Sequence, residues 1–173
     1  MNRIPALLAA VLVTSMYGAS AQAASDGKIY PAMMCRPTAA SASNWTVDSY
    51  GRMYNSSTTA TLTIVCPVLD DETDTSTSSN DISVDVYYID ASAGTSLSCT
   101  FTSRDIVTNV TSDYDTYTTS AFASAAVQTM SLGALVAGDW GDDFAYIKCT
   151  LPAKDTSLGY SYLVAYRVDE DAS

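Results

Sequence analysis

Residues 144–152 read Phe-Ala-Tyr-Ile-Lys-Cys-Thr-Leu-Pro, and this stretch alternates between apolar and more polar side chains. Alternate residues of a β-strand point to the same face of a sheet. Ile147, Cys149 and Leu151 therefore share one face, which is apolar. The alternation predicts a half-buried strand whose cysteine points into the interior of the protein.

The same period-2 pattern recurs along the chain, which is rich in Thr, Ser, Tyr, Val and Ile. Turn-forming residues such as Ala91-Ser-Ala-Gly94 separate the alternating runs. No window forms a convincing amphipathic helix; residues 121–136 are rich in alanine but contain Gly133. We predict an all-β, single-domain antiparallel β-sandwich of about nine strands, Ig-like or jelly-roll-like. The predicted strands are 28–36, 45–54, 60–67, 82–90, 96–103, 107–119, 126–135, 143–151 and 160–169.

The four cysteines, Cys35, Cys66, Cys99 and Cys149, all share a strand phase with apolar neighbours. Inward cysteines in an exported chain are typical of a disulfide framework, whereas a metal site favours C-x-x-C spacing. Four cysteines allow three connectivities, between which sequence alone does not decide. We favour Cys35 with Cys66 and Cys99 with Cys149, since these pairs join neighbours along the chain.

The N-terminus has the three parts of a secretory signal. Arg3 precedes an apolar run at residues 6–13, and Ala21-Gln-Ala23 offers small residues for cleavage after Ala23. We therefore expect a signal peptide at 1–23, one domain at 24–173, and a periplasmic or extracellular location. Once the signal is removed, we expect no membrane span.

The composition excludes several functional classes. A formal charge of −11 disfavours nucleic acids and anionic membranes as partners. The sequence contains no histidine, which excludes histidine-based triads and metal centres. We expect no enzyme activity, no catalytic residue, no bound metal and no cofactor.

One acidic turn combines carboxylates with an aromatic ring: Asp139, Trp140, Asp142 and Asp143. These residues could contact calcium or a sugar, with the carboxylates as oxygen donors and Trp140 as a stacking surface. The alternative, which we favour, is a strand-joining turn, because turns select Asp and Gly for backbone reasons alone.

Tyr160, Tyr162 and Tyr166 share one phase of the last predicted strand. If they point outward, they form a face on which sugar rings can stack. Tyrosine is also a strong strand former, so a purely structural role is the alternative we favour. Three triplets fit the glycosylation acceptor pattern, starting at Asn44, Asn55 and Asn109, and the sequence does not decide whether they are used.

Two resemblances point to a sandwich. Asp143, Ala145 and Cys149 resemble the corner motif of immunoglobulin domains, although Ile147 stands where those domains have tyrosine. The spacing of Cys35 and Cys66 and the final alternating strand, 159–168, resemble chaperone-usher pilus subunits. Those subunits have a tyrosine next to last, where this chain has Ala172, and a second disulfide is unusual for them.

We expect a non-catalytic protein with a structural or interaction role at or outside the cell envelope, as a surface or fibre component. An unpaired edge on the last or first strand would support self-association or contact with another envelope protein. The alternative is a carbohydrate-binding module that uses exposed tyrosines with Trp45 or Trp140. An Asp-based hydrolase is a third hypothesis and would need two facing aspartates in a cleft.

Overall fold

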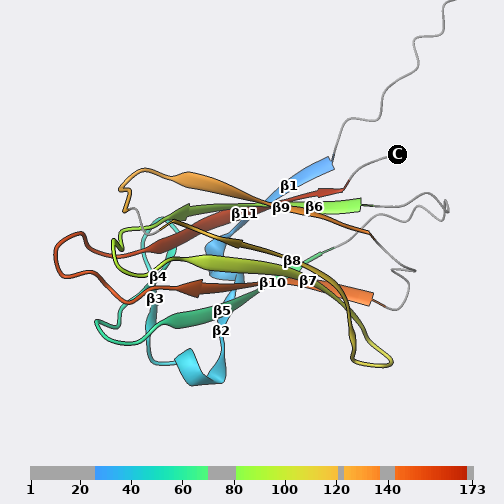
Figure 1. Ribbon diagram of the computed structural model, residues 1–173, viewed down its shortest axis with the longest axis horizontal. Helices are drawn as coiled ribbons and strands as arrows, with labels where there is room; N and C mark the ends of the chain where they lie inside the picture. The colour runs from blue at the N-terminus through green and yellow to red at the C-terminus, as the bar shows by residue number, and fades with distance from the viewer. Residues whose placement is uncertain (1–25, 70–80, 121–122, 137–142, 171–173) are drawn as a thin grey trace, which may run out of the picture.

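The computed structural model describes residues 26–69, 81–120, 123–136 and 143–170. Two antiparallel sheets lie face to face in it, so the chain is the all-β sandwich that the alternation predicts (Figure 1). The strands are β1 (Asp26–Pro31), β2 (Arg36–Pro37), β3 (Trp45–Val47), β4 (Met53–Asn55), β5 (Leu62–Val68), β6 (Asp81–Ile89), β7 (Ser98–Asp105), β8 (Thr111–Thr118), β9 (Gln128–Val136), β10 (Asp143–Leu151) and β11 (Tyr162–Glu170). Two short 3-10 helices, η1 (Ala32–Met34) and η2 (Ala39–Ser41), lie between the first strands.

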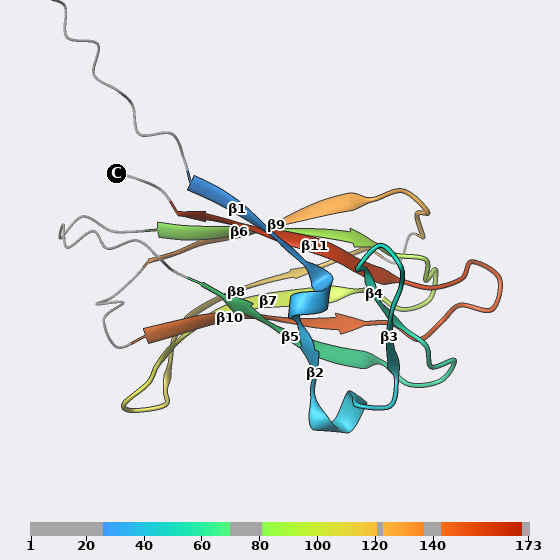
Figure 2. The ribbon, with the colours of Figure 1, turned by 180° about the vertical axis from the view of Figure 1, so that it is seen from behind.

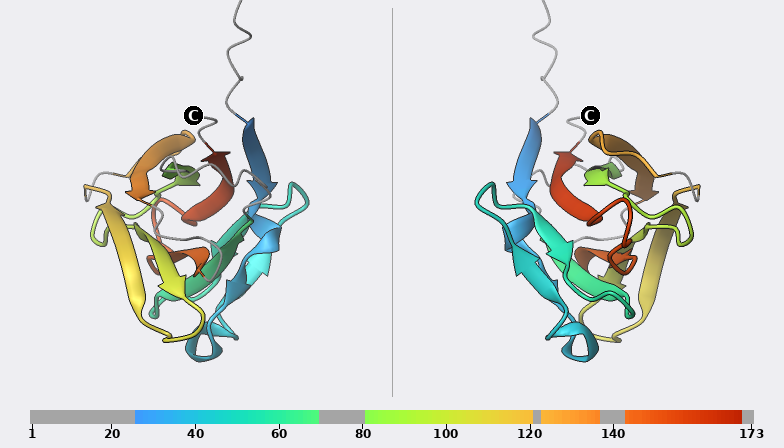
Figure 3. Two further views of the ribbon diagram at one scale, coloured as in Figure 1. Left: turned by 90° about the vertical axis from the view of Figure 1, so that its right-hand side faces the viewer. Right: turned by 90° about the vertical axis from the view of Figure 1, so that its left-hand side faces the viewer.

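The first sheet, here called sheet A, has the strand order β3-β4-β11-β6-β9, and β1 pairs with β11 beside β4. Sheet B has the order β2-β5-β10-β7-β8. Because β1 belongs to sheet A and β2 to sheet B, the first segment crosses from one sheet to the other along one side of the sandwich (Figures 2 and 3).

The core lies between the two sheets and follows the alternation. In β5 every second residue is buried, beginning with Leu62. Phe101 of β7 and Ile147 of β10 are fully buried and are directly paired. Sheet A supplies buried residues such as Val86 and Leu132 from its inner face. The period-2 pattern therefore predicted the buried face of strands such as β5 and β10.

Two predicted strands are each divided in the structure. Residues 28–36 form β1 and β2, because η1 follows Pro31 and redirects the chain toward sheet B. Residues 45–54 form the β3–β4 hairpin, whose turn contains Gly51 at a φ of 78°. A positive φ of this size favours glycine, so this residue allows the tight reversal.

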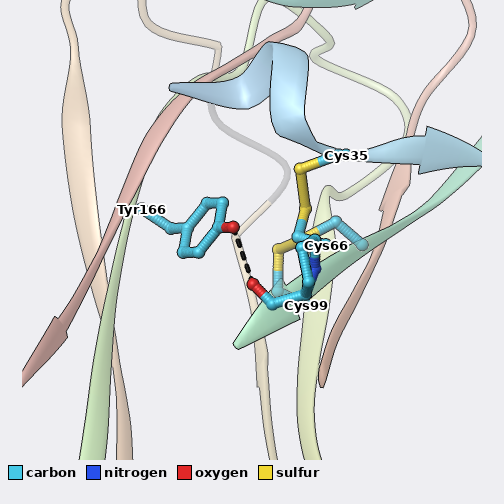
Figure 4. The surroundings of a disulfide bond; sticks show 6 residues. Cys35, Cys66, Cys99 and Tyr166 are labelled. Carbon is cyan, nitrogen blue, oxygen red and sulfur yellow. Dashed lines mark hydrogen bonds between the residues drawn. A yellow bond between two sulfur atoms is a disulfide. The ribbon is translucent and has the colours of Figure 1, made fainter. Parts of the chain in front are cut away.

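Both disulfides have the connectivity that the sequence favoured. Cys35 bonds Cys66, and Cys99 bonds Cys149. Cys99 and Cys149 are directly opposite each other in β7 and β10, so this bridge crosses adjacent strands of sheet B. Cys35 lies between η1 and β2 and ties that crossing segment to β5 (Figure 4). All four side chains are buried, and no described cysteine is free.

The prediction that Tyr166 shares an outer face with Tyr160 and Tyr162 is wrong. The pairing of β11 with β6 shifts between Leu163 and Ala165, which inserts one extra residue into the strand. Such a bulge moves every later side chain to the opposite face. Tyr166 is therefore buried in the core, where its hydroxyl donates a hydrogen bond of 2.6 Å to the Pro67 carbonyl (Figure 4).

Burial raises the pKa of Tyr166 to about 12, with a smaller contribution from Tyr30, whose ring stacks on it at 5.2 Å. Between pH 10 and about pH 12, the folded protein therefore keeps the phenol of Tyr166 protonated, whereas an unfolded tyrosine, with a pKa near 10.0, has lost its proton. The resulting stability is fully present below pH 10 and is lost as the pH rises toward 12, a change of about 2–3 kcal/mol.

Denaturant unfolding measured from neutral to strongly alkaline pH should show this loss. In Tyr166→Phe the free energy of unfolding should fall by about 1 kcal/mol at neutral pH, because the bond to Pro67 is lost. The alkaline decline should also become shallower than in the wild type. An equally steep decline in both proteins would show that another group causes it.

The last strand does not offer an open edge. β11 pairs with β6 along one side and with β1 and β4 along the other, so the expectation is wrong for the last strand. Among the described strands, the first strand, β1, pairs with β11 alone and lies at an edge of sheet A. Where β8 and β9 approach each other, the Asp115 carboxylate accepts hydrogen bonds from the amides of Thr116 in β8, at 2.8 Å, and Gly133 in β9, at 2.6 Å. Asp113 caps the amide of Tyr114 in the same way, at 2.8 Å. These carboxylates occupy amides that an added strand would need.

Candidate ligand-binding face

Six side chains gather on the outer face of sheet A, where β4 and β11 pair. We call this group the tyrosine face: Tyr50, Arg52, Tyr54, Lys154, Tyr160 and Tyr162. It forms because Tyr54 and Tyr162 are directly opposite each other in β4 and β11. The ring centroid of Tyr54 lies 5.3 Å from that of Tyr162 and 4.6 Å from that of Tyr160.

The β3–β4 turn orders one end of the face. One carboxylate oxygen of Asp48 accepts the backbone amides of Tyr50, at 2.9 Å, and Arg52, at 3.0 Å. Its other oxygen lies 2.8 Å from Nε and 2.7 Å from Nη2 of Arg52. The guanidinium is thereby placed 4.6 Å from the Tyr162 ring centroid and 5.2 Å from that of Tyr50. The arginine therefore lies between two tyrosine rings.

The segment that precedes β11 orders the other end. Asp155 and Gly159 bond each other through both backbone groups, at 2.9 and 3.0 Å, and Gly159 has a φ of 103°. This small loop sets the ring of Tyr160 under the ammonium of Lys154, which lies 4.5 Å from the ring centroid. The backbone amide of Lys154 also donates to the Ser57 carbonyl at 2.7 Å.

The buried side-chain amide of Asn55, at the end of β4, links β4 to the segment that precedes β11. The side-chain nitrogen of Asn55 donates to the carbonyls of Ala60 and Pro152, at 2.8 and 2.9 Å, while its oxygen accepts the Ser57 amide at 3.0 Å. Asn55 is fully buried, so one of the three glycosylation triplets has its asparagine inside the protein. Asn109 is exposed and Asn44 is half-buried.

The charges of the face depend on pH. Partial burial opposes the charged form of Asp48, but hydrogen bonds from the Arg52 side chain and from the amides of Arg52 and Tyr50 outweigh it. The pKa of Asp48 therefore lies below its ordinary value of 3.8. The ionised Asp48 side chain therefore orders the β3–β4 turn above about pH 4, and this stabilisation is lost as the pH falls below that range. Burial raises the pKa of Tyr162, so its phenol stays neutral at physiological pH.

The predicted site residues are only partly brought together. Tyr160 and Tyr162 lie in the tyrosine face, whereas Tyr166 lies in the core. Trp45 is half-buried and packs against the core, so it is not an exposed platform. Asp139, Trp140 and Asp142 lie outside the described residues, as does the side chain of Asp143, whose backbone begins β10.

Sequence reasoning missed Tyr50, Arg52, Tyr54 and Lys154 as members of the face. The first three could have been found in the stretch Tyr50-Gly-Arg-Met-Tyr54. Tyr50, Arg52 and Tyr54 are alternate residues in it, and Gly51 indicates a turn. Nothing in the sequence indicated that β4 pairs with β11. In the part of the chain that the structure describes, no three acidic or cysteine residues are grouped so that they could hold a metal ion. Likewise, no described helix is long and apolar enough to cross a membrane.

No protein-family model matches this sequence, and no curated protein is significantly similar to it. Among solved structures, the CBM36-1 domain of a multidomain xylanase from the hindgut metagenome of Trinervitermes trinervoides aligns with a TM-score of 0.44 and 7% identity, over 86% of this chain and 99% of that one.

Two further alignments each cover 84% of this chain. The family 11 carbohydrate-binding module of the cellulase Lic26A-Cel5E of Clostridium thermocellum has a TM-score of 0.38 and 10% identity, with 84% of its own length covered. Dimeric latent PorU from Porphyromonas gingivalis also has a TM-score of 0.38, with 12% identity and 12% of its length covered. All three TM-scores lie below 0.5, so the similarity to these structures is distant.

Proposed function

We propose that this chain is an exported, non-catalytic carbohydrate-binding domain and that the tyrosine face is its binding surface. The observation that carries the proposal is the grouping of four tyrosine rings with two cations on one outer sheet face. Tyr50 is 81% exposed. Tyr54, Tyr160 and Tyr162 are half-buried, so packing holds these three rings in place while part of each remains accessible.

This chemistry suits a sugar polymer. Each pyranose ring has an apolar face of C–H groups that can pack on an aromatic ring, and hydroxyl groups at its edge that need hydrogen-bond partners. The tyrosines offer both an apolar ring and a phenol hydroxyl. Arg52 and Lys154 add further donors at the two ends of the face. Because Asp48 and the Asp155 loop already order these side chains, binding costs little additional conformational entropy.

The rival function, a fibre subunit that accepts a neighbour's strand, has less support. It required an open edge on the last or first strand. β11 is paired along both sides, so of these two strands only β1 lies at an edge of sheet A. The facing edges of β8 and β9 carry the aspartate caps described above. The outer face of sheet A therefore supports carbohydrate binding better than the sheet edges support fibre assembly.

The test is retention of the domain comprising residues 24–173 on a panel of insoluble polysaccharides, including cellulose, xylan, mannan and chitin. We expect saturable binding to at least one of them. Tyr50→Ala should weaken it about five- to thirtyfold, since one stacked ring contributes about 1–2 kcal/mol. Tyr114→Ala is the matched control, because Tyr114 is 66% exposed on the other sheet. No retention on any polysaccharide, or equal losses in the two variants, would contradict the proposal.

A further inference from the structure

The hairpin that joins β7 and β8 displays apolar side chains at its tip. Ile106 is 62% exposed, Val107 78% and Val110 60%. Hairpin tips usually carry polar and turn-forming residues in contact with water. Three exposed aliphatic residues within five positions are therefore unusual and mark this tip as a contact surface.

The tip is also well ordered by its own hydrogen bonds. The Asp105 carboxylate accepts the amides of Val107 and Thr108, both at 2.7 Å. The Arg104 guanidinium donates twice to the Asn109 carbonyl, at 3.0 and 2.7 Å. The backbone closes the loop through the Asp105 amide, which donates to the Val110 carbonyl at 3.1 Å. The aliphatic side chains are thus presented on a preorganised turn, which lowers the entropic cost of binding.

Aromatic residues extend this surface along the outer face of sheet B. Phe144, 43% exposed, is directly opposite Arg104 at the base of the hairpin, and its ring stacks on that of Tyr146 at 5.9 Å. Tyr114 and Tyr146 are both paired with Thr102 and so flank it on either side. In Figures 1 and 2 the hairpin tip bends away from sheet A, past the start of β10. We call the group of Ile106, Val107, Val110, Tyr114 and Phe144 the hairpin patch.

We propose that the hairpin patch is the contact surface of a homodimer. The exposed parts of its five side chains amount to roughly 500 Å² per copy, judged from the usual burial areas of aromatic and aliphatic residues. Two copies would then bury roughly 1,000 Å², about the lower bound for a specific interface. A single patch of this size is at the upper end of what monomers expose. The area therefore fits a weak, reversible dimer.

The shape of the patch suits a two-fold contact. A two-fold interface uses the same surface on both copies, so this surface must contain two complementary parts. Here a projecting hairpin tip lies near the ring of Phe144, which stacks on Tyr146 at the border of the patch, and each tip can pack on this ring of the partner copy. Strand-to-strand pairing through β8 is disfavoured, since Asp113 and Asp115 cap its amides. A lipid surface is a poorer occupant, because the chain carries a formal charge of −11.

The test is sedimentation velocity of the residue 24–173 domain over a concentration series from low to high micromolar. We expect a monomer–dimer equilibrium that strengthens with added salt, because salt screens the repulsion between two acidic copies. Val107→Asp should weaken dimerisation at least tenfold, and Ile106→Ser should weaken it in the same direction. Val127→Asp is the control, since Val127 is 55% exposed outside the patch.

A strictly monomeric wild type would overturn the inference. So would a Val107→Asp variant that dimerises like the wild type, a Val127→Asp variant that fails to dimerise, or association that weakens with salt. The result is independent of carbohydrate binding: Val107→Asp should retain polysaccharide binding, and Tyr50→Ala should retain dimerisation.

Discussion

Replacing both Cys99 and Cys149 with alanine is expected to lower the free energy of unfolding by about 4 kcal/mol. The bond closes a loop with a sequence separation of 50 residues, and the chain-entropy model assigns a loop of this length a stabilisation of that size. Since a domain's net stability is about 5–15 kcal/mol, the variant should lose a large fraction of it. The two alanines keep the site apolar and leave no unpaired thiol.

Urea unfolding of the wild type and of the double variant measures this loss directly. The matched comparison is Cys35→Ala with Cys66→Ala, whose separation of 31 residues predicts a slightly smaller loss of about 3.5 kcal/mol. Free thiols in unreduced wild-type protein, or a loss below about 1 kcal/mol in both double variants, would contradict the view that these cysteines are structural crosslinks.

Asp90→Ala is expected to destabilise the fold by about 3–5 kcal/mol. Asp90 is fully buried at the end of β6, and its two oxygens accept four hydrogen bonds. The donors are the amides of Ser92 and Leu97 and the hydroxyls of Thr119 and Ser161. Removing the carboxyl takes this acceptor from the Ser92 amide and the two hydroxyls, while the Leu97 amide keeps its bond of 2.9 Å to the Thr119 hydroxyl. Each unsatisfied buried donor costs about 1–3 kcal/mol.

Asp85→Ala is the matched control for this prediction. Asp85 lies in β6, the strand that Asp90 directly follows, but its side chain is 30% exposed, and it accepts a hydrogen bond from Ser131 at 2.6 Å. Its ion pair with Arg167, at 4.0 Å, lies near the surface, where such pairs contribute about 0–1 kcal/mol. Thermal and urea unfolding should therefore separate the two variants clearly. Equal losses would show that Asp90 does not hold this end of the sandwich together.

The long strands and the disulfides could be predicted from the sequence, because both depend on which face each residue occupies. β5 and β10 follow strict alternation, and the inward phase of Cys99 and Cys149 identified them as candidates for crosslinking. The bulge near Val164 could not be predicted, since no glycine or proline marks it. This one extra residue moved Tyr166 from the predicted outer face into the core.

The candidate site was only half predictable for a similar reason. Tyr160 and Tyr162 are close in sequence, so their proximity was expected. Tyr54 joins them only because β4 pairs with β11, a contact between segments that are far apart in the chain. Arg52 is placed between two rings by the Asp48 turn, and that turn lies inside a range that the alternation assigned to one continuous strand.

The most direct test of the carbohydrate-binding proposal is NMR of the 24–173 domain with labelled tyrosine rings, titrated with soluble oligosaccharides of the panel polysaccharides. We predict saturable shifts of the ring signals of Tyr50, Tyr54, Tyr160 and Tyr162, while Tyr114 and Tyr146 on sheet B stay unchanged. No saturable shift with any oligosaccharide, or shifts confined to the rings on sheet B, would contradict the assignment of the tyrosine face as a sugar-binding surface.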